Sequence, residues 1–184
     1  MYRRIYHRMR NFNEMWFVAG GWAIDLYIEK ETRPHHDIEI AVFRKDQFKI
    51  KDYLKEFEFQ QVQKGKFYPW TDKYLEHPIH EIHATNKAGD KIEILLNETD
   101  GENWVFRRDF RITYPIKNIY SISDEGIPYL NPEIVLLYKV KGTREKDHQD
   151  FMAVKEYLNR EQKNWLKKAI SIHAPQHKWL KYLV

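Results

Sequence analysis

The 184-residue chain has no cysteine, so it can form no disulfide and use no thiolate chemistry. The lack of cysteine fits a reducing compartment, and we expect the protein to be cytoplasmic. Its formal net charge is only +4. An excess this small does not by itself indicate a nucleic-acid partner.

Hydrophobic runs that could cross a bilayer are also missing from the sequence. The longest mainly apolar stretch extends from Met15 to Ile24, far short of the ~20 residues that a membrane-spanning helix needs. The N-terminal segment MYRRIYHRMRNFNEM is basic and lacks the apolar centre of a signal peptide. We therefore expect no membrane partner.

The sequence does contain enough apolar residues for the core of one ordinary domain. Apolar residues make up 42% of the chain and charged residues 32%, which is typical of a buried core under a well-solvated surface. Hydrophobic periodicity predicts short strands alternating with helices in the first part of the chain. We expect strands at 16–19, 37–43 and 59–62, a hairpin across 80–96, extended structure at 104–116, and helices at 3–13, 22–29 and 46–57.

The character of the chain changes at Asn131. In NPEIVLLYKVKG, Asn131 is a typical N-cap, Pro132 suits the first helical position, and Glu133 falls in the first turn. Two further helical patterns follow, over 144–158 and 160–174. The sequence predicts a mixed sheet with flanking helices over residues 1–128 and a helical C-terminal region packed on it over residues 129–184.

Two features of the segment AGGWAIDLYIEKETRPHHDIEIAVF indicate chemistry. Gly20 and Gly21 follow an apolar strand and open a helix, where backbone N–H groups free of side chains can approach a phosphate. Asp37 and Glu39 interrupt the next apolar strand, and buried carboxylates are costly unless they are paired or metal-bound. Residues two apart on a strand share one face, so both carboxylates can converge on one divalent cation.

A third carboxylate, Glu93, lies in the apolar strand KIEILL. If this strand lies beside the strand at 37–43, three acids meet at one place. Ligands that are all oxygen favour Mg²⁺ or Mn²⁺ over zinc. Together with the glycine turn, these acids predict a nucleoside-triphosphate site for metal-assisted phosphoryl or nucleotidyl transfer.

These residues resemble the DNA polymerase β-type nucleotidyltransferase superfamily. The pair GGWAID and TRPHHDIEI is most similar to its small antibiotic-modifying branch, the aminoglycoside 2''-nucleotidyltransferases and lincosamide nucleotidyltransferases. The match is strong over residues 16–43 and looser at Glu93 and at REKDHQDF, residues 144–151. The resemblance implies an α+β, polymerase β-like fold. It also implies an enzyme that moves a nucleoside monophosphate, AMP first of all, from ATP or another NTP to a hydroxyl of a small molecule.

The resemblance also implies roles for individual residues. Asp37 and Glu39 would bind the metal, and Glu93 would be a further ligand or the base that activates the acceptor hydroxyl. Gly20 and Gly21 would hold the triphosphate. Further residues would lie near the phosphates or on a charged helix that closes over nucleotide or substrate; these are Arg33, His35, Lys146, Asp147 and Asp150.

The chain departs from the family pattern at two positions. The second acid is Glu39 rather than the commoner Asp. The Ser that usually follows the first Gly is replaced by Gly21, so one phosphate hydrogen bond must come from elsewhere.

Simpler interpretations exist for the same residues. A Gly-Gly pair alone is more often a tight turn, and Asp37 and Glu39 could form the solvent face of an edge strand. Glu93 alternates with isoleucines and could also face outward. A solvated loop or helix face accounts equally for the charged residues implied by the resemblance.

The histidines His77, His80 and His83 do not have the spacing of a metal motif. Their i, i+3, i+6 pattern fits neither one face of a strand nor a HExxH helix, and Pro78 interrupts it. We therefore expect no zinc site in this segment.

The sequence leaves the acceptor open. A polycationic aminoglycoside needs a strongly acidic pocket, whereas the remaining acids are interleaved with Lys and Arg. A less charged acceptor, such as a lincosamide, therefore stays open. Two other classes remain: a nucleotidyltransferase for a protein or RNA acceptor, and a non-catalytic nucleotide-binding module, against which the intact acids and glycines argue.

Overall fold

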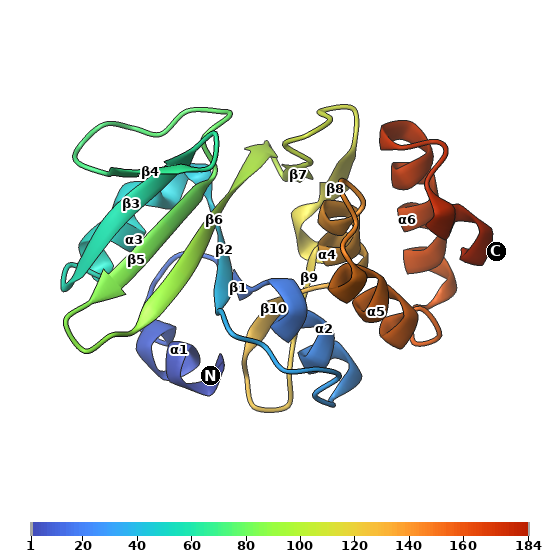
Figure 1. Ribbon diagram of the computed structural model, residues 1–184, viewed down its shortest axis with the longest axis horizontal. Helices are drawn as coiled ribbons and strands as arrows, with labels where there is room; N and C mark the ends of the chain where they lie inside the picture. Colours follow the sequence, from blue (N-terminus) through green and yellow to red (C-terminus); the bar gives the residue numbers. More distant parts are fainter. Residues whose placement is uncertain (1, 184) are drawn as a thin grey trace.

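The computed structural model describes residues 2–183 and shows a mixed β-sheet with helices packed around it (Figure 1). The strands are β1 (Trp16–Val18), β2 (Glu39–Phe43), β3 (Phe57–Gln63), β4 (Lys66–Pro69), β5 (Glu81–Asn86), β6 (Lys91–Asp100), β7 (Asn103–Val105), β8 (Thr113–Pro115), β9 (Tyr120–Ile122) and β10 (Pro128–Leu130). The helices are α1 (Tyr2–Met9), α2 (Gly20–Ile28), α3 (Gln47–Tyr53), α4 (Pro132–Lys139), α5 (Glu145–Val154) and α6 (Arg160–His173), with 3-10 turns η1 (Arg44–Asp46), η2 (Ile116–Asn118) and η3 (Lys178–Tyr182). This is the α+β class that the sequence predicts.

The topology places β2 and β6 side by side in the middle of the sheet. The strand order is β4-β3-β5-β6-β2-β1-β10-β9, and β7 and β8 continue from β6. β2 and β6 run parallel, whereas β5 is antiparallel to β6 and β1 is antiparallel to β2. In Figure 1 the long strands β3, β5 and β6 lie on one side of the molecule, and α4, α5 and α6 gather on the other. β1 and β2 lie between these two groups.

The predicted hairpin across 80–96 is confirmed by β5 and β6. Their register pairs His83 with Glu93 and Ile82 with Ile94. The turn is closed locally, because the Asp90 backbone N–H donates to Asn86 Oδ1 at 2.9 Å. Ile82 and Ile94 are fully buried. Their neighbours along the strands, His83 and Glu93, therefore face the opposite side of the sheet.

The elements around the glycine turn differ from prediction at their ends. α2 begins at Gly20 rather than at Trp22, and β2 begins at Glu39 rather than at Asp37. The pairing of β1 with β2 ends at Val18 and Ile40, because the chain turns into α2 immediately after β1. Asp37 therefore precedes the strand and is exposed.

Two predicted helices are also shorter than expected. α1 ends at Met9 instead of residue 13, and α3 ends at Tyr53 instead of residue 57. The apolar residues beyond α3 serve the next strand, since Phe57 begins β3 and is buried. In the sequence, the helical spacing of apolar residues continues beyond the residue at which tertiary contacts end the helix in the structure.

The start of α4 confirms the predicted positions but not the predicted cap. Asn131 is the N-cap residue and Pro132 follows it, yet in the described structure the Asn131 side chain makes no capping hydrogen bond. Its amide donates to the Asn118 carbonyl at 2.8 Å, and its Oδ1 accepts from Ser121 Oγ at 2.7 Å. Asn131 thus ties α4 to the preceding strand region.

The C-terminal helices pack on one another and on α2. α4 contacts α2, α5 and α6, and its residues Ile134 to Leu137 are buried. β10, which directly precedes α4, belongs to the main sheet. The division of the chain at residue 128 stays a prediction. Across residues 2–183, no helix combines the length and the apolar character needed to span a membrane.

Candidate active site

The glycine turn accepts no side chain at either position. Gly20 has a φ of +62°, and a Cβ there would lie 1.5 Å from Glu39 Oε2. A Cβ on Gly21 would lie 2.2 Å from His35 Cε1 and 2.6 Å from Arg33 Nη2. The turn is therefore packed against Glu39 at one glycine and against the loop before β2 at the other.

The first turn of α2 can donate hydrogen bonds to a bound ligand. Within the described structure, no side chain caps this helix, whose N-cap residue is Ala19. Its unpaired N–H groups and the positive end of the helix dipole favour an anion. The Glu39 carboxylate already lies against Gly20 at this end. An incoming phosphate would therefore meet both the helix terminus and a carboxylate, an arrangement that a divalent cation stabilises.

The predicted convergence of two acids is a direct consequence of the sheet register. Glu39 of β2 and Glu93 of β6 are partners on neighbouring parallel strands. The Glu93 backbone N–H donates to the Ile38 carbonyl at 2.9 Å. Ile38 and Ile40 are buried, as expected when Glu39 faces the other side. Asp37 lies just before β2, and its charge raises the pKa of both Glu39 and Glu93.

The electrostatics of the two strand acids fit a site for a cation. Burial raises the pKa of Glu39, although Lys139, Lys146 and Arg144 counteract it. Burial, followed by repulsion from Glu39, raises the pKa of Glu93 to about 7. Among the described residues, none donates a hydrogen bond to either carboxylate. Two adjacent acids without protein donors offer all-oxygen ligands to Mg²⁺ or Mn²⁺.

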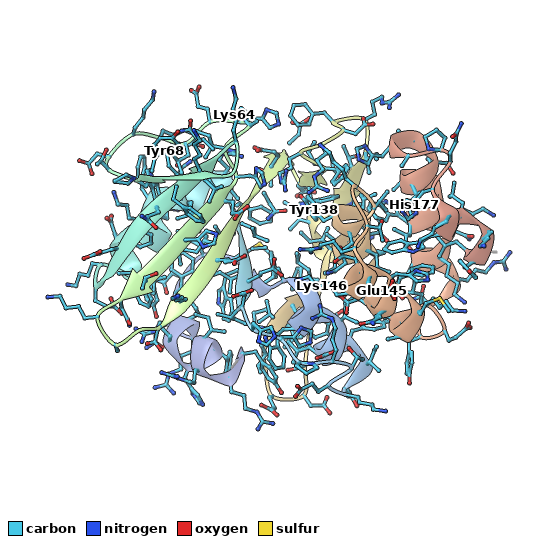
Figure 2. The ribbon with its side chains drawn as sticks, viewed as in Figure 1. Lys64, Tyr68, Tyr138, Glu145, Lys146 and His177 are labelled. Atoms are coloured by element: carbon cyan, nitrogen blue, oxygen red, sulfur yellow. The ribbon has the colours of Figure 1, made fainter. Side chains whose placement is uncertain are left out.

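A cleft of about 410 Å³ opens over Gly20, Glu39 and Glu93. Its other charged lining residues are Glu81, Arg107, Arg108, Lys139, Lys141, Arg144 and Asp147. Figure 2 shows Tyr138, another lining residue, and Lys146 between the strands and the C-terminal helices. Glutamates on the sheet side thus face lysines and arginines on the opposite side.

Arg33 and His35 are held by buried carboxylates behind the glycine turn. Arg33 Nε and Nη2 donate to the two Asp150 oxygens at 2.7 and 3.0 Å. His35 Nε2 lies 2.6 Å from Asp25 Oδ2, and its ring packs on Trp22 with centroids 4.5 Å apart. Burial alone would raise the pKa of Asp25, but hydrogen bonds from His35 and Thr32 lower it. These contacts position the turn; direct contact of Arg33 and His35 with phosphates stays a prediction.

The acids of α5 hold cations in place. Lys139 Nζ lies 3.0 Å from both Asp147 Oδ1 and Asp150 Oδ2, and Arg144 Nε lies 2.9 Å from Asp147 Oδ2. Asp147 and Asp150 are buried, whereas Lys146 is exposed. The predicted helix therefore presents Lys146 at its surface and uses its two aspartates to anchor Lys139, Arg144 and Arg33.

A second groove, of about 680 Å³, meets the site from the α1 side. Asp37 and Glu93 border it, and Glu93 lines both cavities. Its remaining polar and charged walls are mixed in sign and come from α1, the loop before β2 and the β5–β6 hairpin: Arg4, His7, Arg8, His36, His83, Thr85, Asp90 and Lys91. Glu93 therefore stands where two cavities meet.

Sequence reasoning missed the cationic wall of the cleft. Lys139 is the last residue of α4, and Arg107 and Arg108 follow β7. No local motif marks them, since Lys139 is placed by the packing of α4 against α2 and α5, and Arg107 and Arg108 by their contacts with Tyr138. The available signal was the clustering of Lys and Arg at 139–146 directly before the acidic positions of α5.

The fold and the arrangement of glycine turn, strand acids and facing cations define a nucleotidyltransferase. The model of the aminoglycoside-2''-adenylyltransferase family matches residues 2–154. The chain belongs to this family, and it is an enzyme of nucleotidyl transfer. This confirms the resemblance seen in the sequence.

Solved structures share the fold at low sequence identity. The lincosamide antibiotic adenylyltransferase LnuA, solved with lincomycin bound, has a TM-score of 0.60 and 17% identity, covering 85% of this chain and 96% of its own. ANT(2'')-Ia in complex with adenylyl-2''-tobramycin has a TM-score of 0.62 and 12% identity, covering 94% of this chain and 97% of its own. Identities this low establish the fold alone. No curated protein matches the chain in sequence.

Proposed function

We propose that the chain transfers a nucleoside monophosphate, AMP first of all, from a metal-bound NTP to a hydroxyl of a small molecule. The observation that carries the proposal is the contact of Glu39 with the Gly20 turn, opposite Glu93 on the adjacent strand. It places metal-ligating oxygens beside a helix N-terminus suited to phosphate. A divalent cation bound there would offset charge on the triphosphate and polarise the reacting groups.

The chain's own residues account for binding and for proton transfer. The N–H groups at the start of α2 would donate hydrogen bonds to the triphosphate oxygens, while Asp37 and Glu39 would supply oxygens to its cation. Lys146 and the anchored Lys139 lower the pKa of Glu39 and supply positive charge for the phosphates. Glu93 borders both the cleft and the groove, and it would bind the metal or take the hydroxyl proton.

The chemical step is an in-line displacement at the α-phosphorus. The acceptor oxygen forms a bond to this phosphorus while the bond from the phosphorus to the bridging oxygen of pyrophosphate breaks. Pyrophosphate leaves with the electron pair, and the acceptor proton passes to a carboxylate or to solvent. Lys139, Lys146 and Arg144 counteract the rise that burial causes in the pKa of Glu39, and they are suited to offset the charge of the leaving group.

The charge of the cavities favours an acceptor with few positive charges. The cleft combines its carboxylates with Arg107, Arg108 and Lys141, and the groove contains Arg4, Arg8 and Lys91. A polycationic aminoglycoside would meet these cations at close range. A neutral or weakly charged hydroxylated molecule of the lincosamide type therefore fits better.

The test is a pyrophosphate-release screen of each NTP with Mg²⁺ against lincosamides, aminoglycosides, other hydroxylated metabolites, short RNAs and candidate protein acceptors. Mass spectrometry then measures the mass added to the acceptor. We expect one nucleoside monophosphate on a small molecule, and none with Glu39→Gln. Transfer to RNA or protein alone would reassign the acceptor class, and no transfer to any acceptor would contradict the proposal.

A further inference from the structure

The wall between the two cavities carries a group of three possible metal ligands. The group is distinct from the glycine turn and from Asp37. Glu81 and His83 lie two apart on β5, and Glu93 is the partner of His83 on β6. One ligand atom of each residue lies within 4.8 Å of the others. Ligand atoms of one coordination sphere lie at comparable separations once the side chains close around an ion.

The surroundings of His83 hold its ring toward this group. His83 Nε2 lies 2.8 Å from Glu81 Oε1, and the Phe67 ring packs edge-on against the imidazole with centroids 4.9 Å apart. The side chains of His83 and Glu81 are only 27% and 33% exposed. A partly buried imidazole beside two carboxylates can serve as a nitrogen ligand once a cation replaces its hydrogen bond to Glu81.

The position of the group connects it to both cavities. Glu81 lines the cleft over Gly20, His83 lines the groove on the α1 side, and Glu93 lines both. A cation held here would lie next to Glu93 on the side away from Glu39, since β6 lies between β5 and β2. It would therefore lie where the cleft and the groove meet.

We propose that Glu81, His83 and Glu93 form a second divalent-metal position with a nitrogen ligand, at the junction of the cleft and the groove. This inference rests on the proposed function only in treating Glu93 as an active-site residue. Imidazole favours transition metals, whereas Mg²⁺ favours oxygen ligands alone. The second position therefore selects Mn²⁺ or a similar ion over Mg²⁺, while the Asp37 and Glu39 position accepts either.

The direct probe is Mn²⁺ bound to the full chain without nucleotide, examined by pulsed electron paramagnetic resonance for coupling to imidazole ¹⁴N. We expect the coupling in the wild type, in His7→Ala and in the double variant Asp37→Asn/Glu39→Gln, and its loss in His83→Ala. His7 lines the same groove but is not one of the clustered ligands, so it is the matched control. Circular dichroism verifies that each variant is folded.

The strength of binding gives a second measurement. Loss of an outer-shell partner alone weakens metal binding roughly 10–100-fold, so loss of the imidazole should weaken Mn²⁺ binding at this position by at least about tenfold. Calorimetry should show this in His83→Ala and in Glu81→Gln, but not in His7→Ala.

Two results would overturn the inference: no ¹⁴N coupling in the wild type, or coupling that persists in a folded His83→Ala. If Mn²⁺ then still supports NTP binding, the proposed function stands and only the second position is lost. If Mn²⁺ binds neither with nor without NTP, the inference and the proposed function both fail.

Discussion

Glu39 Oε2 lies only 1.5 Å from the position that a Cβ of residue 20 would occupy. Gly20 is therefore required twice: by its φ of +62° and by the carboxylate that lies over it. The contact joins the phosphate-binding turn to the acid of β2, so the position of one fixes the position of the other.

Gly20→Ala should abolish transfer while leaving the protein folded. The new Cβ displaces the end of the Glu39 side chain, and the left-handed backbone costs about 1–2 kcal/mol for a non-glycine residue. Gly65→Ala is the matched control, since Gly65 has a φ of +74° and nothing within 4 Å of an added Cβ. We expect similar losses of stability but a loss of activity, on the order of 100-fold, only at Gly20. Equal activities of the two variants would contradict this prediction.

Arg33→Gln should destabilise the protein by about 2 kcal/mol, because the buried Asp150 carboxylate loses its bidentate partner and keeps only Lys139. The Asp150 side chain is 0% exposed, and that of Arg33 is 17% exposed. Arg111→Gln is the comparison, since Arg111 is 72% exposed in its pair with Asp109 and its loss should change stability much less. Denaturant unfolding measures both variants. Similar small costs would show that the Arg33 pair does not anchor the turn.

Lys146→Ala should raise the KM for the nucleotide by a factor of about 3–30, an effect of about 0.6–2 kcal/mol, without unfolding the protein. Lys146 is exposed, and its charge lowers the pKa of Glu39. Lys168→Ala removes an exposed lysine from α6 and should leave the KM unchanged. Steady-state kinetics at a fixed acceptor concentration measures the KM for the nucleotide in both variants. An unchanged KM in Lys146→Ala would remove α5 from the nucleotide site.

Glu133→Gln should change how stability depends on pH. Burial raises the pKa of Glu133 to about 7, although its own backbone N–H and Gln162 counteract the shift; Gln162 Nε2 donates to Glu133 Oε2 at 2.9 Å. The folded state therefore favours the neutral carboxyl. Its contribution is fully present below the ordinary pKa of 4.5 and is lost as the pH rises to about 7, up to about 3 kcal/mol.

The variant cannot ionise at this position, so its stability relative to the wild type should increase between pH 4.5 and 7. Unfolding curves of both proteins at several pH values give the difference directly. Parallel pH profiles would mean that Glu133 is ionised at little cost in the folded protein.

Much of the fold follows from local patterns in the sequence. The hairpin of β5 and β6 was predictable because its strands alternate and its turn contains Asn86 and Asp90. The positions of β1 and β2 followed from short buried apolar runs. The ends of α1 and α3 were not predictable, because apolar spacing continues into residues that serve other elements. The side-chain role of Asn131 was missed because its partners, Asn118 and Ser121, are brought to it by the strand pairing.

The candidate site divides in the same way. Gly20, Gly21, Asp37 and Glu39 belong to one short segment, so spacing alone could group them. Glu93 could be added only on the condition that its strand is next to β2, which the parallel register satisfies. The cationic wall and the position of His83 beside Glu93 depend on helix packing and on β5–β6 register. Histidine spacing along the chain gave no sign of this pairing, since the ligands lie across two strands.

The central claim is that Asp37 and Glu39 bind the cation that carries the triphosphate, and calorimetric titration of a non-hydrolysable ATP analogue tests it most directly. The wild type and Glu39→Gln are each titrated with Mg²⁺ and with EDTA, after circular dichroism has shown that both are folded. We predict tight binding only by the wild type with Mg²⁺, and weak binding, reduced at least about tenfold, in the other three titrations. Equal affinity of the wild type in Mg²⁺ and EDTA, or an unchanged Mg²⁺ effect in Glu39→Gln, would contradict the account.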